Sequence, residues 1–424
     1  MPIKITYTNQ DINDVISFVE IINCNIVSKI DCSVLKANQL TSLAAFDTNI
    51  NFPNLQVFNC ANNQLTSLPD MNFPNLQQLN CSHNRLTSLP DNMNFPNLQY
   101  FGCCDNQLTS LPDNMNLPNL QHFDCSDNKL TLLTNNMNFS NLCEFHCSYN
   151  TLTSLPNNMN LPNLQIFHCF YNTLTSLPDN MNFPNLETFY CFNNDLTALP
   201  YNMNFPNLCE FKCHNNFLTS LPNDMNLPNL EKFKCSNNKL TSLPDNMTFP
   251  NLEEFDCYNN KLTSLPNMNL PNLKTLWCSY NDLTALPDNM NFPNLEALGC
   301  SNNDLTSLPA CILNFKNLKC FHHHCNKYTN LSSQMEQFID IKKDQGYIKR
   351  DLCFTEDLNV IKLLLEEGID IDGLCICGHT AIHYHTIENN FDIVKYLLSK
   401  GADVNKKNIY GDGINKDALA WGTS

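Results

Sequence analysis

The stretch from Leu230 to Pro250 reads LEKFKCSNNKLTSLPDNMTFP, and most of the chain repeats it. Its fixed letters are L-x-x-F-x-C-x-x-N-x-L-x-x-L-P, in steps of 22 residues that shorten to 21 at two places. Looser copies are centred on Asn38 and Asn326. The fixed asparagine recurs at Asn63, Asn84, Asn106, Asn128, Asn150, Asn172, Asn194, Asn216, Asn238, Asn260, Asn281 and Asn303. An internal period of this length predicts a solenoid in which each repeat forms one turn.

Each repeat has a strand-like part and a return part. Around Phe233 and Cys235 apolar and polar residues alternate, which is typical of a strand with one buried face. Residues 242–250 contain two prolines and are too few for a return helix, so we expect turns, extended segments or a short 3₁₀ piece there. Stacked repeats then place their strands in one parallel sheet, with neighbours about 4.8 Å apart.

The fixed letters of the repeat should form its core. The side chains expected to point inward are Leu230, Phe233, Cys235, Leu240, Leu243 and Met247. Asn238 stands where the chain leaves the strand, and its amide can satisfy backbone groups that would otherwise be buried unpaired. We therefore interpret the asparagine column as structural.

This pattern resembles the leucine-rich repeat family over residues 30–331, with Phe and Cys filling two of the apolar places. The resemblance implies an α/β solenoid: a curved parallel-β horseshoe with mostly non-helical convex segments. In this family the concave face is the surface generally used for binding.

Composition limits the class of protein. The chain has a net charge of −17 and no basic run, so we expect no nucleic-acid partner. No stretch approaches the roughly 18 apolar residues of a membrane span. Because the N-terminus is polar and acidic, we expect an intracellular protein in a reducing compartment. No motif indicates a cofactor or a catalytic site, so we predict a protein that is not an enzyme.

Twelve of the 23 cysteines occupy one column of the repeat. They are Cys60, Cys81, Cys103, Cys125, Cys147, Cys169, Cys191, Cys213, Cys235, Cys257, Cys278 and Cys300. At strand spacing their Cβ atoms stand side by side, somewhat beyond the usual disulfide separation of about 3.8 Å. We expect them to be reduced, buried and structural.

Four regions follow from these patterns: a cap at 1–29, repeats at 30–331, a connector at 332–350 and a tail at 351–424. In the cap, Asp11 could begin a short helix that covers the first strand edge. The tail has a second period of 33 residues, with GHTAIH, FDIVKYLL and GADVN as its phrases. These phrases resemble the ankyrin repeat, which implies a small helical unit. We expect this unit to pack on the end of the array as a cap.

The variable positions beside the buried Phe and Cys should point off the concave face. In the middle repeats they become aromatic, histidine-bearing and then basic, which is typical of binding hot spots. The predicted partner-binding residues are His146, Tyr149, Ile166, His168, Phe170, Tyr171, Tyr190, Phe192, Lys212, His214, Lys232 and Lys234. We expect Phe170, Tyr190 and Phe192 to face solvent. Neutral drift in a duplicated array is the alternative, and the lysines hint at a partner with negative charge.

The last repeat departs from the pattern. Its strand places Cys320, His322 and His324 at alternate positions, so that they share the concave face and form a weak candidate zinc site. The neighbouring repeat offers no evident fourth ligand, and a decaying terminal repeat explains the same residues.

These observations favour a non-catalytic scaffold that binds a protein partner on its concave face. Two alternatives stay open: a substrate adaptor for a ubiquitin ligase, and a structural or packing component without a specific ligand. The near-identical, asparagine-rich repeats, joined to an ankyrin-like tail, resemble proteins of giant DNA viruses of amoebae. This resemblance implies that the partner could be a host factor.

Overall fold

The computed structural model divides into two compact units, Met1–Phe338 and Ile339–Ser424. The described residues are 3–6, 27–33, 40–43, 52–344, 352, 358–366, 368–374, 380–387 and 390–407. Within 52–344 the description leaves out 71–72, 92, 135–136, 138, 158, 180, 202, 204, 224, 226, 246 and 248.

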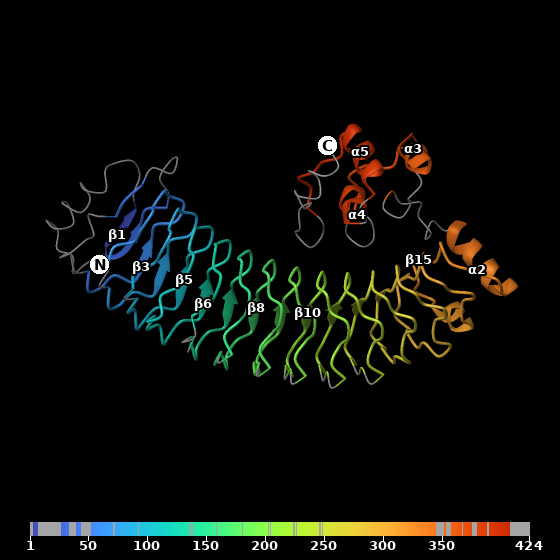
Figure 1. Ribbon diagram of the computed structural model, residues 1–424, viewed down its shortest axis with the longest axis horizontal. Coiled ribbons are helices and arrows are strands. Elements are labelled where there is room, and N and C mark those ends of the chain that lie inside the picture. The colour runs from blue at the N-terminus through green and yellow to red at the C-terminus, as the bar shows by residue number, and fades with distance from the viewer. Residues whose placement is uncertain are drawn as a thin grey trace. The chain divides into compact units, whose positions relative to one another are not determined.

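The first unit is built on one sheet of 15 strands that pair in chain order, each parallel to the next (Figure 1). The strands are β1 (Ile3–Thr6), β2 (Val27–Asp31), β3 (Val57–Asn59), β4 (Gln78–Asn80), β5 (Tyr100–Gly102), β6 (His122–Asp124), β7 (Glu144–His146), β8 (Ile166–His168), β9 (Thr188–Tyr190), β10 (Glu210–Lys212), β11 (Lys232–Lys234), β12 (Glu254–Asp256), β13 (Thr275–Trp277), β14 (Ala297–Gly299) and β15 (Cys320–His322). The predicted solenoid is therefore confirmed, one strand to each repeat.

The core of the array is a stack of identical residues. In β5 to β12 the phenylalanine at the centre of each strand pairs with its equivalent in the next, as Phe145 does with Phe167, whereas β4, β13 and β14 have a leucine there. Their rings are parallel, with centroids 5.5 Å apart, and both side chains are fully buried. Leu230, Phe233, Cys235, Leu240, Leu243 and Met247 all lie in this core, as predicted.

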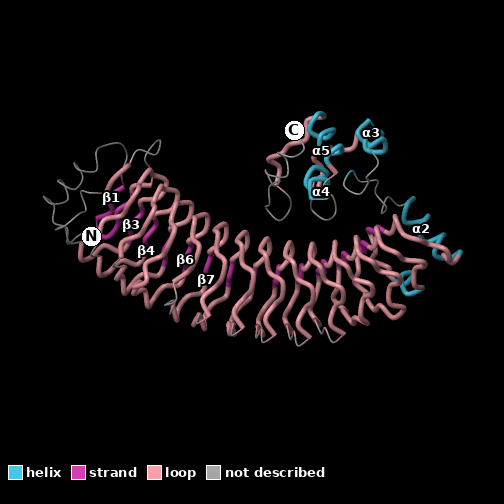
Figure 2. Tube along the Cα trace, viewed as in Figure 1, coloured by secondary structure: helices cyan, strands magenta, loops and turns pink. Residues whose placement is uncertain are grey.

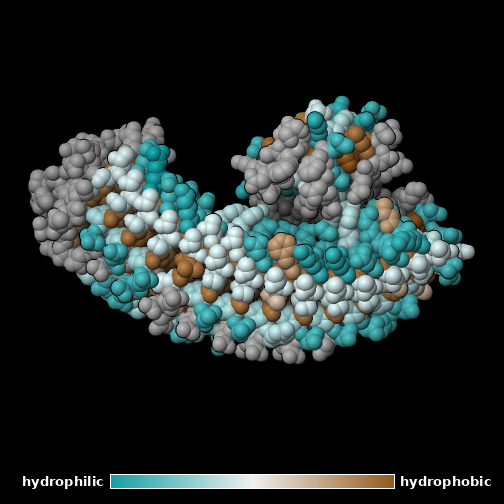
Figure 3. Space-filling view, in the orientation of Figure 1, coloured by the Kyte–Doolittle hydropathy of each residue, from teal (hydrophilic) through white to brown (hydrophobic). Residues whose placement is uncertain are grey.

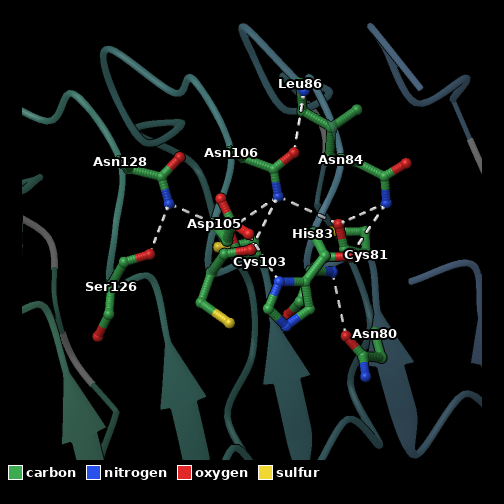
Figure 4. Close-up of polar contacts among 12 residues, drawn as sticks. Asn80, Cys81, His83, Asn84, Leu86, Cys103, Asp105, Asn106, Ser126 and Asn128 are labelled. Carbon is green, nitrogen blue, oxygen red and sulfur yellow. Dashed lines mark hydrogen bonds and ion pairs between the residues drawn. The ribbon is translucent and has the colours of Figure 1, made fainter. Parts of the chain in front are cut away.

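The asparagine column joins each repeat to its neighbours. The amide nitrogen of Asn106 donates to the carbonyl oxygens of Cys103 and Cys81, and its oxygen accepts the backbone N–H of Leu86 (Figure 4). The same bonds recur at each asparagine of the column from Asn84 to Asn303. Asn326 makes them too, so the looser last copy keeps the framework. The structural interpretation of this column is confirmed.

The residue before each of these asparagines has a left-handed backbone. Its φ lies between 49° and 58° in all 13 repeats where it is described. The residues are Asn62, His83, Asp105, Asp127, Tyr149, Tyr171, Asn193, Asn215, Asn237, Asn259, Tyr280, Asn302 and Cys325. Asn and Asp tolerate this conformation, whereas bulky residues adopt it at a cost.

The return segments are mostly turns and extended chain, as predicted (Figure 2). Among the described return segments, a 3₁₀ helix, η3 (Ala310–Asn314), stands in the last one. A second asparagine ladder ties the outer turns together: Asn163, for example, donates to the carbonyl oxygen of Ser140 at 2.8 Å. Unlike the first ladder, this one is exposed to solvent.

The ends of the sheet differ from the expectation. β1 pairs with β2, so the sheet begins one strand before the first expected repeat. The helix expected to begin at Asp11 lies outside the described residues. At the other end, helix α2 (Ser333–Asp344) packs Phe338 against Phe321, with ring centroids 6.3 Å apart. The first part of α2, which belongs to the first unit as far as Phe338, thus covers the apolar core at the last strand.

The second unit contains helices α3 (Leu358–Glu366), α4 (Ala381–Ile387) and α5 (Phe391–Ser399). His385 Nε2 lies 2.8 Å from the carbonyl oxygen of Leu352, 33 residues earlier, so the period seen in the sequence is also a contact. The predicted helical unit is present. Its role as a cap on the array stays a prediction.

The described cysteines are all free, and the predicted column is buried. Burial raises the pKa of these thiols, to about 12 at Cys278. Several donate to a backbone carbonyl of the next repeat, as Cys147 Sγ does to His168 at 3.5 Å. The column therefore acts as small apolar filler that also links neighbouring turns.

Replacing Asn172 by alanine should lower the free energy of unfolding by about 2–3 kcal/mol. The amide accepts from Leu152 at 2.9 Å and donates to the carbonyls of Cys147 and Cys169, each at 3.1 Å. Removing it leaves these groups buried and unpaired. The measurement is urea unfolding followed by circular dichroism.

The matched control is Asn163→Ala in the same repeat, because Asn163 is exposed and lies on the outer ladder. We expect it to change stability by about 0.5 kcal/mol or less. Equal losses in the two variants would contradict a special role of the buried column.

Candidate interaction surface

The twelve predicted partner-binding residues lie together on β7–β11 and on the turns that follow these strands. They occupy four equivalent positions of the repeat: the first and third residues of the strand, and the second and third residues after it. Because the strands pair in register, residues at one position stand in a row across the sheet. We call the aromatic part of this surface, formed by His146, Tyr149, His168, Phe170, Tyr171, Tyr190, Phe192 and His214, the aromatic patch.

One row of the patch runs through the third strand position. His146 Nδ1 lies 3.0 Å from His168 Nδ1, and the His168 ring stacks on Tyr190 with centroids 4.4 Å apart. Lys212 follows, with its ammonium 4.0 Å from the centre of the Tyr190 ring. Burial lowers the pKa of His168 to about 3, and the neighbouring His146 and Lys212 lower it in the same direction. His168 is therefore neutral at physiological pH.

The second row runs through Phe170, Phe192 and His214. Phe192 stacks on Phe170 and on His214, with centroid distances of 4.4 Å on each side. As a result Phe192 is only 6% exposed. The expectation that it faces solvent is wrong, because at strand spacing two neighbouring rings cover both of its faces. Phe170 and Tyr190, which were expected to face solvent as well, are half-buried.

The third row consists of two tyrosines in the left-handed column. Tyr149 and Tyr171 stack with centroids 4.6 Å apart and planes within 10°. Their φ angles are 52° and 51°, where most other repeats place Asn, Asp or His. Tyr149 is nevertheless 47% exposed. Tyr149 also meets Phe170 edge to face, with centroids 5.4 Å apart, yet much of its ring stays exposed. Residues held in a costly backbone conformation cluster at functional sites.

The basic residues at the end of the patch are partly neutralised within the chain. The Glu210 carboxylate oxygen Oε1 lies 3.6 Å from the Nζ atom of Lys212 and 3.4 Å from that of Lys232. The other carboxylate oxygen accepts a hydrogen bond from the Tyr190 hydroxyl. Burial alone would raise the pKa of Glu210, but the Tyr190 hydrogen bond and the two ammonium groups together lower it. Lys234, expected on the open face, is 6% exposed, and burial lowers the pKa of its ammonium group. It stands in register between Lys212 and Asp256, which flank it on both sides. The lysines thus give little support to a negatively charged partner.

A smaller aromatic group lies further along the sheet. Tyr258 and Tyr280 are in contact, with ring centroids 5.2 Å apart, and Tyr280 is again left-handed, with φ 55°. Trp277 lies over Gly299, where an added Cβ would come within 2.4 Å of the indole. The glycine is therefore required by the large side chain beside it.

The candidate zinc residues are not brought together as a metal site. Cys320 and His322 are buried, and the rings of His322 and His324 meet edge to face with centroids 5.9 Å apart. His322 instead lies near Trp277, at a centroid distance of 6.1 Å. Within the described residues no group of three His, Cys, Asp or Glu side chains is placed to hold a metal ion. The alternating spacing alone was insufficient, because the rings turn toward aromatic neighbours.

Sequence reasoning missed the acidic residues of the surface. Glu144 is within 3.1 Å of His122 and 3.8 Å of His146, and Glu210 organises the basic end. Both occupy the same strand position as Ile166, so aligning the repeats position by position could have found them. The left-handed column gave no such signal, since a tyrosine in a turn looks unremarkable in a sequence.

The outer surface carries a regular pattern as well, with apolar side chains recurring turn by turn along the array (Figure 3). In the part of the chain that the structure describes, no helix combines the length and the apolar character that crossing a membrane requires.

Comparisons with known proteins agree with this architecture. The family model for leucine-rich repeats matches residues 53–92 and 250–288, and that for ankyrin repeats matches 352–408. A leucine-rich repeat protein of Leptospira interrogans has a TM-score of 0.66 at 29% identity, over 76% of this chain and 83% of its own. YopM, a leucine-rich effector protein of Yersinia pestis, has a TM-score of 0.51 at 31% identity, over 66% of this chain and 80% of its own.

A viral protein resembles the tail. A putative ankyrin repeat protein of fowlpox virus is 43% identical over 61 residues, which are 14% of this chain. This chain spans only 17% of the length of that relative.

The second row, which contains Phe192, and the third row, which contains Tyr149 and Tyr171, should differ in what they contribute to the free energy of unfolding. Phe192→Ala should lower the free energy of unfolding by about 3 kcal/mol, because it opens a gap between two stacked rings. The double variant Tyr149→Asn, Tyr171→Asn should change it by no more than about 1 kcal/mol, since relief of the left-handed strain offsets the lost stacking.

Chemical denaturation of the three proteins under one buffer condition measures both effects. A loss in the tyrosine variant as large as that in Phe192→Ala would show that the tyrosines serve the fold, and would remove the argument for their function.

Proposed function

The chain belongs to the leucine-rich repeat proteins and carries ankyrin repeats in its C-terminal part, and from this we propose that it binds a protein partner through the aromatic patch. Both repeat families typically serve as scaffolds for protein–protein interaction and are generally non-catalytic. The scaffold supplies a rigid sheet, and the variable positions on it supply specificity.

The observation that carries this proposal is the pair Tyr149 and Tyr171. Their backbone conformation favours Asn, and neighbouring repeats use Asn there, at Asn193 and Asn215 among others. The framework has no need of tyrosine at this position. Tyr149 is exposed and Tyr171 is half-buried. Tyrosines held by stacking lose little conformational entropy on binding and are enriched among interface hot spots.

We also propose a viral origin, a partner in a host cell and a reducing compartment as the location of the protein. The similarity of the tail to a poxvirus ankyrin repeat protein supports a viral source, and the effector protein of Yersinia pestis supports a partner in a host cell. The free thiols of the described cysteines support a reducing compartment.

The test is affinity capture from a lysate of the native host, comparing the wild type with the double variant Tyr149→Asn, Tyr171→Asn. We expect at least one protein that the wild type retains to be depleted about tenfold or more with the variant, because two anchor side chains are removed.

The matched control is Tyr201→Asn. Tyr201 is 80% exposed but lies in a return segment, and the equivalent position is Asn in the next repeat, at Asn223. The control should retain the same partners as the wild type. If both variants give the wild-type list of partners, the patch is not a binding surface.

A further inference from the structure

The aromatic patch borders an acidic margin on its N-terminal side. Asp124 at the end of β6 pairs in register with His146, and the N–H of Asn128 donates to the carbonyl of Tyr149. Asp127, one residue before Asn128, therefore occupies the left-handed position of the repeat next to Tyr149. Asp127 thus lies beside Tyr149, and Asp124 lies beside His146.

Among the described residues no Lys, Arg or His forms an ion pair with Asp124 or Asp127. His83 is held by Asp105 at 2.7 Å, and His146, in register with Asp124, lies 3.8 Å from Glu144 and 3.0 Å from His168. Burial raises the pKa of Asp127, the charge of Asp105 raises it further, and the charge of His83 lowers it. The margin is therefore crowded with negative charge, which a cation from outside would relieve.

The opposite side of the patch differs in this respect. There Glu210 contacts Lys212 and Lys232, so each charge has a partner within the chain. The neighbouring carboxylate Glu144, on β7, is also engaged, by His122 at 3.1 Å. Beside the N-terminal side of the patch, Asp124 accepts the backbone N–H of Ser126 at 3.0 Å, and Asp127 is exposed to solvent, so both carboxylates keep their negative charge without an ion pair.

We propose that the partner contributes a short segment with an arginine or lysine side chain that lies against Tyr149 and pairs with Asp124 and Asp127, followed by apolar residues on Tyr171 and Phe170. A guanidinium group suits this place best, because it can stack on an aromatic ring and hydrogen-bond a carboxylate at the same time. The net charge of −17 would favour the approach of such a segment. This inference rests on the proposed function and names the chemistry of the partner.

The probe is a library of random dodecapeptides displayed on phage, selected against the purified full-length chain. We expect the enriched peptides to combine an arginine or lysine with nearby aromatic, proline or leucine residues. One enriched peptide, made with a fluorescent label, is then titrated against the variants by fluorescence anisotropy.

Asp124→Asn with Asp127→Asn should weaken that peptide about fivefold or more, through loss of the ion pairs. Asn is favoured at the backbone conformation of residue 127, so the fold should be retained. The control is Asp179→Asn with Asp245→Asn, which changes the net charge equally at exposed positions of the return segments. It should leave the affinity unchanged.

The outcomes separate the two proposals. Peptides that bind the Asp124, Asp127 variant as well as the wild type, but lose affinity in Tyr149→Asn, Tyr171→Asn, would overturn the cation inference and leave the aromatic patch as a binding surface. Equal binding to every variant would count against both. Enriched peptides without a basic residue, or no enrichment at all, would also overturn the inference.

Discussion

The structure depends on one interaction, the buried amide of the asparagine column. Each amide closes the turn of its own repeat and reaches back to the repeat before it, as Asn172 does through Cys169 and Cys147. A parallel sheet of three-residue strands offers few ladder hydrogen bonds per repeat. The asparagine amide supplies additional hydrogen bonds where the strands end. A single asparagine at a fixed position of each repeat is sufficient for this.

Because the framework is satisfied by a fixed set of residues, the remaining positions can vary without loss of the fold. Rows of equal position then bring residues from distant parts of the sequence into contact at strand spacing. Aromatic residues placed in such rows stack on one another, as Phe170, Phe192 and His214 do. Substitutions in neighbouring repeats thus produce a continuous surface, and the same framework holds tyrosines at the left-handed position where other repeats have Asn or Asp.

Most of the fold could be predicted from the sequence, since a period of 22 residues with fixed apolar letters allows one arrangement in which they are all buried. The candidate surface was predicted less well. Which positions share a row follows from register, but whether a ring such as that of Phe192 remains exposed depends on the size of both neighbours. Pairings such as Glu210 with Lys212 and Lys232 depend on side-chain conformations, which periodicity does not specify. The strain at Tyr149 arises from its backbone φ angle, which the amino-acid sequence does not reveal.

The most direct test of this account is native-state hydrogen exchange at the leucine amides that donate to the asparagine column, namely Leu130, Leu152, Leu174 and Leu196. If the column carries the framework, these amides should exchange at one common slow rate set by global unfolding, whichever variable residues surround them. Slow exchange confined to the repeats of the aromatic patch, with fast exchange at Leu130, would contradict the account, because it would show that the variable side chains hold the array together.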